Sequence, residues 1–337
     1  SFMPTDEPIP EIIHGAVIRA SGGWYEVDAP LAGKPHGLRL ICQTRGLMKK
    51  GRQRVSQPVV VGDQVEVRTA PTHGANARGE RLQEGSILKV LPRRSELGRA
   101  RYGKTKQITV ANLDLVIVVM SVREPDLNTH RLDRFLVLAE ANDLDALICF
   151  NKVDLINKST FKREIAPVQK SYKSLGYRCL STSDETDEGI EELRTLLENK
   201  ISVFAGSSGV GKTSLACAVQ PGLHLWIGEV MDIGKGRHTT TEVTLHPLDG
   251  GGYLVDTPGI KTVMLLEEHE VNLAECFPEF RGFLGQCRFN NCSHREEPGC
   301  AMREAVEKKK ITAPRYQSYL RILEEFKQRP TRYGNRE

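Results

Sequence analysis

The amino-acid sequence predicts a multidomain chain of three parts: an N-terminal β-barrel, a central α/β domain and a small helical C-terminal domain rich in cysteine. Short β-forming runs separated by glycine turns fill residues 11–91, with no helical run among them. From residue 112 to 255, apolar strand-like runs alternate with amphipathic helical patterns. Beyond residue 272 the chain is polar and helical, and three cysteines gather near one histidine. We expect domain boundaries at 1–92, 93–272 and 273–337.

The composition is that of an ordinary soluble protein. Charged residues make up 27% and hydrophobic residues 39% of the chain. No apolar run approaches the ~20 residues that cross a bilayer, and no signal-peptide pattern opens the chain, so we expect no membrane partner. The cysteines outside the C-terminal cluster are scattered singly, which favours a reduced, intracellular protein. The net charge of +4 does not by itself indicate nucleic-acid binding.

The N-terminal part is predicted to be an OB-like barrel of six short strands. The expected strands are residues 12–18, 24–27, 38–42, 59–61, 64–67 and 87–90. Barrels of this kind often bind oligonucleotides, and the basic run Lys49–Arg54 suits either a phosphate contact or a solvated loop. Residues 91–106 hold six basic residues and one acidic residue, and we interpret them as an extended linker that contacts RNA or only connects domains.

The central part is predicted to hold a mostly parallel sheet covered by helices. Its expected strands are 113–120, 145–150, 177–180, 201–205, 242–246 and 252–255, and its expected helices are a pattern around Leu132–Ala139, then 159–175, 188–199 and 214–220. The continuous apolar runs are typical of strands buried on both faces. Ligands of such sheets bind at the carboxyl ends of the strands, and the motifs of this domain fall at those ends.

A phosphate-binding loop follows the strand 201–205. Its pattern G-x-x-x-x-G-K-[ST] consists of Gly206, Ser207, Ser208, Gly209, Val210, Gly211, Lys212 and Thr213. The strand before it and the helix after it supply the context that makes the match meaningful. The glycines let backbone N–H groups turn toward phosphate oxygens. Lys212 is expected to reach the terminal phosphates, and Thr213 to ligate Mg²⁺.

A base-recognition motif follows the strand 145–150. Asn151, Lys152, Val153 and Asp154 form the pattern N-K-x-D. The Asp154 carboxylate can accept hydrogen bonds from the N1–H and the exocyclic amine of guanine, which adenine does not offer in that arrangement. Asn151 and the Lys152 stem would orient the ring. We therefore expect guanine specificity, with Ser181 and Thr182 after the next strand as further nucleotide contacts.

Two more segments complete the predicted catalytic site. Asp256 and Gly259 of the D-T-P-G motif would hold Mg²⁺ through water and bond the γ-phosphate. In the glycine-rich loop 231–241, Thr240 is our choice for closing over Mg²⁺, with Thr239 and Thr241 left open. The residue after Gly259 is Ile260, so the water-orienting glutamine is absent. His238 is the candidate that positions or polarises water, and a plain surface histidine is the alternative.

The order of these motifs is unusual. Ordinary GTPases run phosphate loop, switch threonine, D-x-x-G and N-K-x-D, whereas here N-K-x-D comes first. The sequence therefore predicts a circularly permuted P-loop GTPase domain.

The C-terminal cluster has the spacing of a metal site. Cys287, Cys292, His294 and Cys300 offer three thiolates and one imidazole, a set that suits one structural, tetrahedral Zn²⁺. Cys276 lies outside the spacing and is interpreted as a buried thiol. Arg281, Arg288, Arg295, Arg303 and Lys308–Lys310 surround the cluster, which favours nucleic-acid contact or merely solvated helix faces.

Together these motifs make the chain resemble the RsgA/YjeQ family, the circularly permuted GTPases that depend on the small ribosomal subunit. The matching features span nearly the whole chain: the barrel, N-K-V-D ending at Asp154, G-S-S-G-V-G-K-T, G-R-H-T-T, D-T-P-G and the zinc spacing. The resemblance implies GTP hydrolysis to GDP stimulated by the small subunit, a role in its late maturation, and contacts of the barrel and zinc domain with ribosomal RNA. It also implies that the histidine at 238 serves hydrolysis.

Other functions fit parts of the pattern. The chain is alternatively a nucleotide-gated RNA-binding module, or a GTPase acting on the large ribosomal subunit or transfer RNA. We expect a cytoplasmic monomer, with a plastid or mitochondrial matrix location as the alternative.

Overall fold

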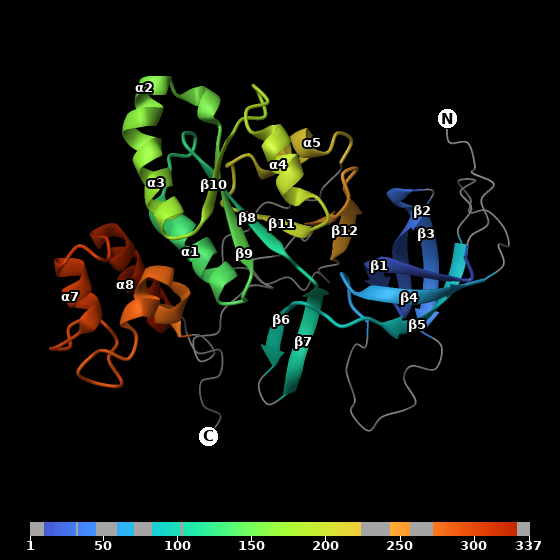
Figure 1. The fold of residues 1–337 in the computed structure, drawn as a ribbon, viewed down its shortest axis with the longest axis horizontal. Helices are drawn as coiled ribbons and strands as arrows, with labels where there is room; N and C mark the ends of the chain where they lie inside the picture. The colour runs from blue at the N-terminus through green and yellow to red at the C-terminus, as the bar shows by residue number, and fades with distance from the viewer. Residues whose placement is uncertain are drawn as a thin grey trace.

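The computed structural model describes residues 10–31, 33–44, 59–70, 83–101, 104–223, 243–256 and 272–328. Figure 1 shows a barrel of strands at the N-terminal side, a sheet flanked by helices in the middle, and a helical C-terminal part beside α1. The predicted fold class is confirmed. No helix within these ranges has the length and apolarity that a membrane crossing requires.

The barrel closes through five strands in the order β1-β2-β3-β5-β4 among the described residues. These are β1 (Ile12–Ser21), β2 (Trp24–Leu31), β3 (Lys34–Thr44), β4 (Gln64–Thr69) and β5 (Gln83–Val90). Their inward side chains, such as Val27, Leu40 and Val65, are fully buried. The sixth expected strand, 59–61, was wrong: these valines are buried, but only Val61 forms an isolated bridge, to Val110. Apolarity there reflects packing rather than strand pairing.

The segment 91–106 is not an extended linker, which corrects the sequence interpretation. It enters an antiparallel hairpin of β6 (Glu96–Arg101) and β7 (Lys104–Ala111), with Leu97 paired to Val110 and both buried. Arg93 forms a two-pronged contact with the buried Asp63 of the barrel, Nε to Oδ1 at 2.6 Å and Nη2 to Oδ2 at 2.9 Å. Paired with Asp63, this guanidinium ties the hairpin to the barrel.

The central sheet has the strand order β10-β9-β8-β11-β13-β12. Its strands are β8 (Leu115–Ser121), β9 (Asp145–Asn151), β10 (Arg178–Thr182), β11 (Ile201–Ala205), β12 (Thr244–Pro247) and β13 (Tyr253–Asp256). The neighbours pair in parallel except for the edge strand β12, which is antiparallel to β13. All residues of β8 are buried, as its apolar run predicts for a strand covered on both faces.

Helices cover both faces of this sheet. One core joins it to α1 (Thr129–Glu140) and α3 (Ala166–Ser174), and the other joins it to α4 (Ile190–Leu197) and α5 (Lys212–Val219). The predicted helix 159–175 consists of α2 (Lys158–Thr160), a π-turn η2 (Phe161–Ile165) and α3. A single 3-10 turn, η1 (Val153–Leu155), follows β9.

The C-terminal part has its own core. It comprises η3 (Leu273–Cys276), η4 (Pro278–Phe283), α7 (Ala301–Glu307) and α8 (Ala313–Gln328). Phe277 and Phe280 stack at 5.0 Å between ring centroids, and Tyr319 of α8 packs edge-on against Phe277. This aromatic core contacts Val137 of α1, which attaches the C-terminal part to the central sheet through one helix.

Candidate nucleotide-binding site and zinc centre

The predicted phosphate loop connects β11 to α5 at the carboxyl edge of the sheet. Two of its glycines are required by close approach. A Cβ on Gly206, whose φ is +154°, would lie 2.5 Å from the Val119 carbonyl oxygen. A Cβ on Gly211, whose φ is +93°, would lie 2.4 Å from Asn151 Nδ2. Any side chain at either position would therefore push the loop away from the neighbouring strands.

The base-recognition motif is hydrogen-bonded to this loop. Asn151, buried at the end of β9, donates from Nδ2 to the Val210 carbonyl at 3.0 Å and accepts at Oδ1 from the Thr182 hydroxyl at 2.9 Å. Lys152 follows in the left-handed conformation with φ at +64°. Its Nζ donates to the Gly209 carbonyl at 2.7 Å and to the Glu124 carbonyl at 2.5 Å. The structure thus joins the two motifs that the sequence predicts separately.

Asp154 is held by a residue that the sequence prediction omitted. The Ser183 hydroxyl donates to Asp154 Oδ1 at 2.6 Å and accepts from the backbone N–H groups of Glu185 and Thr186 at 3.2 Å each. Ser183 is fully buried, so its hydroxyl fixes the carboxylate direction. The predicted contact Ser181 instead accepts a hydrogen bond from Gln169 of η2–α3 at 2.8 Å. The only sequence signal for Ser183 is a hydroxyl residue directly after β10.

The phosphate-side residues lie around the start of α5. Lys212 Nζ donates to the carbonyls of Ser207 at 2.8 Å and Gly206 at 3.2 Å, both within the loop it is expected to serve. Thr213 is exposed in the first turn of α5. The glycine-rich backbone before a helix start is the arrangement that binds phosphate anions.

The predicted magnesium aspartate, Asp256, ends β13 and is 9% exposed. Since β13 runs parallel to β11 and next to it, its end lies at the same sheet edge as the phosphate loop. His246 Nε2 of β12 lies 3.4 Å from Asp256 Oδ2, another contact that the sequence prediction omitted. His238, Thr240 with its alternatives, Gly259, Ile260 and the basic run Lys49–Arg54 lie outside the described residues.

The four predicted zinc ligands converge. The ligand atoms of Cys287, Cys292, His294 and Cys300 all lie within 4.8 Å of one another. His294 Nδ1 faces two of the thiols, at 3.4 Å from Cys287 Sγ and 3.7 Å from Cys300 Sγ. Tetrahedral Zn²⁺ with bonds of about 2.0–2.3 Å places its ligand atoms roughly 3.5–3.8 Å apart. The donor set and its spacing therefore fit a structural zinc ion.

The surroundings of the cluster hold its ligands in place. Tyr316 and Tyr319 of α8 donate to the carbonyls of His294 and Ser293 at 2.7 and 3.0 Å. The Ala301 N–H points to Cys287 Sγ at 3.4 Å, a contact that stabilises a thiolate. Burial lowers the pKa of His294, which keeps the imidazole in the neutral form that binds metal. Cys276 is buried in the adjoining core, and burial raises its pKa to about 12.

Several basic residues around the zinc cluster are already paired. Arg281 binds Glu140 at 2.5 Å, Arg295 binds Glu324 at 2.9 Å and Lys308 binds Glu304 at 3.3 Å. Arg288 instead lies over the ring of Phe289, 5.5 Å from its centroid, and this ring is 42% exposed. The basic flanks therefore include intramolecular ion pairs and two cation–π contacts, because Lys310 Nζ also lies 5.9 Å from the centroid of the Phe283 ring.

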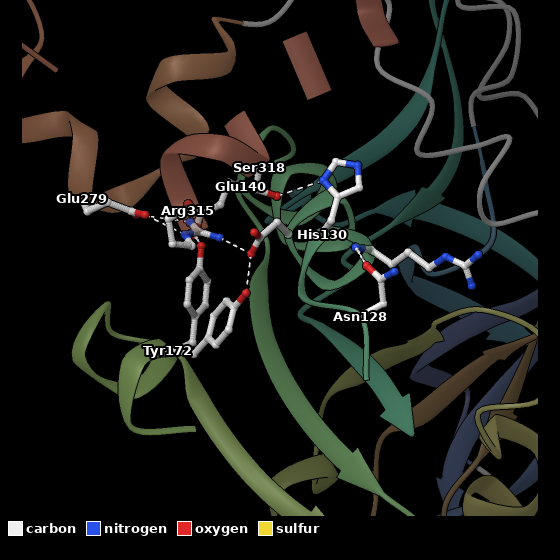
Figure 2. Close-up of polar contacts among 10 residues, drawn as sticks. Asn128, His130, Glu140, Tyr172, Glu279, Arg315 and Ser318 are labelled. Atoms are coloured by element: carbon white, nitrogen blue, oxygen red, sulfur yellow. Dashed lines mark hydrogen bonds and ion pairs between the residues drawn. The ribbon is translucent and has the colours of Figure 1, made fainter. Parts of the chain in front are cut away.

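A buried ion cluster joins the C-terminal part to the central domain. Arg315 of α8 donates to Glu279 at 2.6 Å and to Asp133 of α1, which also accepts from the Tyr172 hydroxyl at 2.6 Å. Figure 2 shows Arg315 between these partners and His130 directed at Ser318, 3.0 Å away. Burial opposes the charge of Arg315, but the Asp133 and Glu279 carboxylates outweigh it and raise the pKa of the guanidinium.

Comparisons with known proteins agree with this geometry. Residues 90–266 match the family model described as RsgA GTPase. The small ribosomal subunit biogenesis GTPase RsgA of Gemmatimonas aurantiaca is 40% identical over 317 residues, which cover 93% of this chain and 97% of that protein. The protein of the same name from Caldanaerobacter subterraneus subsp. tengcongensis is 38% identical over 323 residues, covering 96% and 98%.

Two solved structures share the fold over almost their whole length. The crystal structure of YjeQ from Thermotoga maritima has a TM-score of 0.71 and 35% identity, covering 94% of this chain and 99% of that one. YloQ, described as a circularly permuted GTPase, has a TM-score of 0.68 and 30% identity, covering 96% and 97%. The description of YloQ agrees with the circular permutation that the motif order predicts here.

Proposed function

Because this chain belongs to the RsgA GTPase family, we propose that it binds the small ribosomal subunit and hydrolyses GTP to GDP and phosphate during late maturation of that subunit. The observation that carries the proposal is the hydrogen-bonded junction of Asn151 with the phosphate loop. Asp154, the loop Gly206–Thr213 and the buried Asp256 follow neighbouring strands of one sheet, which supports the proposal that they read guanine, cradle phosphate and hold Mg²⁺. A chance glycine turn or a chance N-K-x-D would not produce this joint arrangement.

Within this proposal the nucleotide contacts have separate roles. Asp154, steadied by Ser183, reads the guanine edge, while Asn151, Lys152 and Val153 shape the base pocket with Ser181 and Thr182. The loop Gly206–Thr213 cradles the phosphates, with Lys212 countering their charge. Thr213 and Thr240 hold Mg²⁺, Asp256 holds it through water, and Gly259 bonds the γ-phosphate. Bound Mg²⁺ neutralises charge on the β- and γ-phosphate oxygens.

We assign water positioning to His238, because Ile260 replaces the glutamine that does this in Ras-type enzymes. His238→Ala should lower stimulated turnover by about a hundredfold or more while GTP affinity stays unchanged. Pre-steady-state hydrolysis and binding of a fluorescent GTP analogue measure the two quantities. Full stimulated turnover in this variant would exclude the role.

The ribosomal RNA contacts are assigned to the barrel and the zinc domain. The exposed Trp24 of β2 offers an aromatic face, and the Arg288–Phe289 pair offers one beside a cation; such faces suit unstacked bases. The relatives are bacterial proteins, so we place this one in the cytoplasm as a monomer. Nothing supports the plastid or mitochondrial alternative.

The test is GTP turnover measured with purified small subunits, with purified large subunits and with none. We expect strong stimulation by small subunits only, and none for Lys212→Ala, which removes the phosphate-binding ammonium. Stimulation by large subunits would favour the alternative target. RNA binding that responds to GTP without turnover would favour the nucleotide-gated binding module.

A further inference from the structure

The edge strand β12 brings a histidine to the magnesium aspartate. In the antiparallel pairing of β12 with β13, Thr244 lies opposite Asp256 and His246 lies opposite Leu254. Side chains two residues apart on a strand share one face of the sheet, so His246 and Asp256 project from the same face. They are diagonal neighbours, at a separation that a ring as long as imidazole can span.

The two side chains lie at the distance of an ion pair rather than of a hydrogen bond, and the described residues offer His246 Nε2 no hydrogen-bond partner. His246 Nε2 lies 3.4 Å from Asp256 Oδ2, with the two side chains 26% and 10% exposed. An imidazole can donate from Nε2 without carrying a formal charge, unlike lysine or arginine. A neutral imidazole can therefore orient the Asp256 carboxylate while leaving the full negative charge of that carboxylate available to Mg²⁺. A fixed cation at this place would weaken the attraction between Asp256 and Mg²⁺.

We propose that His246 is a positioning residue that holds the Asp256 carboxylate in its Mg²⁺-binding orientation. The inference rests on the proposed function, because it concerns the magnesium ion that accompanies GTP. A group that contacts a metal-binding carboxylate restricts its rotamers, and in the metal-loaded site the His246 Nε2–H would close this contact to a hydrogen bond and so raise metal affinity. His246 acts on the metal through Asp256 and does not touch nucleotide.

A purely architectural role would leave a different signature. β12 spans only Thr244–Pro247, and it also contacts β1 of the barrel, so His246 could serve to anchor this edge. Loss of an anchor would weaken nucleotide binding with and without Mg²⁺ alike, and would lower the melting temperature. Loss of a positioning contact would change only the Mg²⁺ dependence.

The experiment uses the full chain without ribosomes and a fluorescent, non-hydrolysable GTP analogue. Its affinity is measured from chelator alone to saturating Mg²⁺ for wild type, H246L, H246Q and H14L. H246L replaces the ring by an apolar group of similar size, and H246Q retains a donor. H14L is the matched control, because His14 Nε2 faces Glu66 at 3.5 Å on the exposed barrel surface.

In H246L, the Mg²⁺ concentration that gives half of the full increase in affinity for the analogue should be about tenfold higher than in the wild type. H246Q should stay near wild type, H14L should be unchanged, and affinity in chelator should be equal for all four proteins. If H246L does not fold, H246N replaces it, because its shorter amide falls short of Asp256. Wild-type Mg²⁺ dependence in H246L or H246N, or an equal loss with and without Mg²⁺, overturns the inference. Failure of the wild type to bind the analogue would instead refute the proposed function.

Discussion

At the scale of single residues, Asn151, which we propose orients the base, also connects the base-recognition motif to the phosphate loop. Its amide donates to the carbonyl of Val210 in the phosphate loop and accepts from the hydroxyl of Thr182, the last residue of β10. One fully buried side chain therefore ties together the ends of three strands. A buried amide with both ends satisfied is rigid, since any rotation would leave a donor or an acceptor unpaired. The distance between the base pocket and the phosphate cradle is set by this residue.

The Asp154→Asn variant should change the base preference of nucleotide binding from guanine to xanthine. The asparagine amide presents a donor where the carboxylate accepted, so it opposes the guanine amine and suits the C2 carbonyl of xanthine. The loss for GTP should be about 2 kcal/mol or more, roughly thirtyfold in affinity. Competition of GTP and XTP for a fluorescent analogue measures the exchange. Unchanged preference for GTP would show that Asp154 does not read the base.

Ser183→Ala should weaken GTP binding by about 1 kcal/mol, roughly fivefold, because Asp154 loses a charge-assisted hydrogen bond at 2.6 Å. Ser181→Ala is the matched comparison, since the Ser181 hydroxyl contacts Gln169 and we expect a smaller loss. Isothermal titration with GTP measures both variants. A larger loss in Ser181→Ala would reverse the two assignments.

The motif residues could be predicted because each motif is a short stretch of sequence. The residues that hydrogen-bond or contact the motifs could not, because they come from other parts of the chain. N-K-x-D and the phosphate loop are read within eight residues of sequence each. The contact of Ser183 with Asp154 depends on a turn between β10 and α4, and that of His246 with Asp256 on the register of two strands. A slip of one residue in that register would send His246 to the other face.

At the scale of elements, buried ion pairs attach the C-terminal part to α1. Arg315 is 4% exposed and contacts Asp133 of α1 and Glu279 of η4. The same carboxylate of Asp133 accepts from Tyr172 of α3, and burial together with Asp133 raises the pKa of this phenol. The cluster therefore links four elements, α1 and α3 of the central part with η4 and α8 of the C-terminal part.

Arg315→Met should lower the free energy of unfolding by about 3–5 kcal/mol, because it leaves two carboxylates buried without their cation. Arg134→Ala is the control, since Arg134 pairs with Glu325 at 3.2 Å on a partly exposed surface and should cost less than about 1 kcal/mol. Urea unfolding followed by tyrosine fluorescence measures both. Equal losses in the two variants would contradict the importance of burial.

Elements with a strong apolar pattern were predictable, and those defined by pairing were not. The run 113–120 became β8 because a strand covered on both faces is apolar throughout. The prediction of an extended linker at 91–106 was wrong because it rested on basic composition, whereas Arg93 pairs with Asp63 and Leu97 lies opposite Val110 in a hairpin. Ion pairing across 30 residues has no signature in local composition.

At the scale of the whole molecule, the zinc centre and the nucleotide site are separately built. The ligands of the cluster are fixed by α7 and α8, while the phosphate loop is fixed by β9 and β11. Helix α1 packs in both parts: its Val137 enters the C-terminal core, and its Leu132 and Leu136 enter the core of the central sheet. Metal loss should therefore unfold one part before the other.

Removal of zinc should abolish stimulation by small subunits while leaving GTP binding in place. The core of the C-terminal part includes the zinc-ligand cysteines and should depend on the metal for folding, whereas the two cores of the central sheet include none of them. Cys292→Ser, which removes one ligand, should lose the near-ultraviolet circular dichroism of Tyr316 and Tyr319 and the stimulated turnover. Cys217→Ser is the matched control, because this exposed thiol lies outside the cluster. Affinity for a fluorescent GTP analogue should be unchanged in both variants.

Stimulation that survives in Cys292→Ser would show that the small subunit stimulates turnover without a folded zinc domain. Loss of GTP binding in this variant would show that the C-terminal part and the central part fold as one unit.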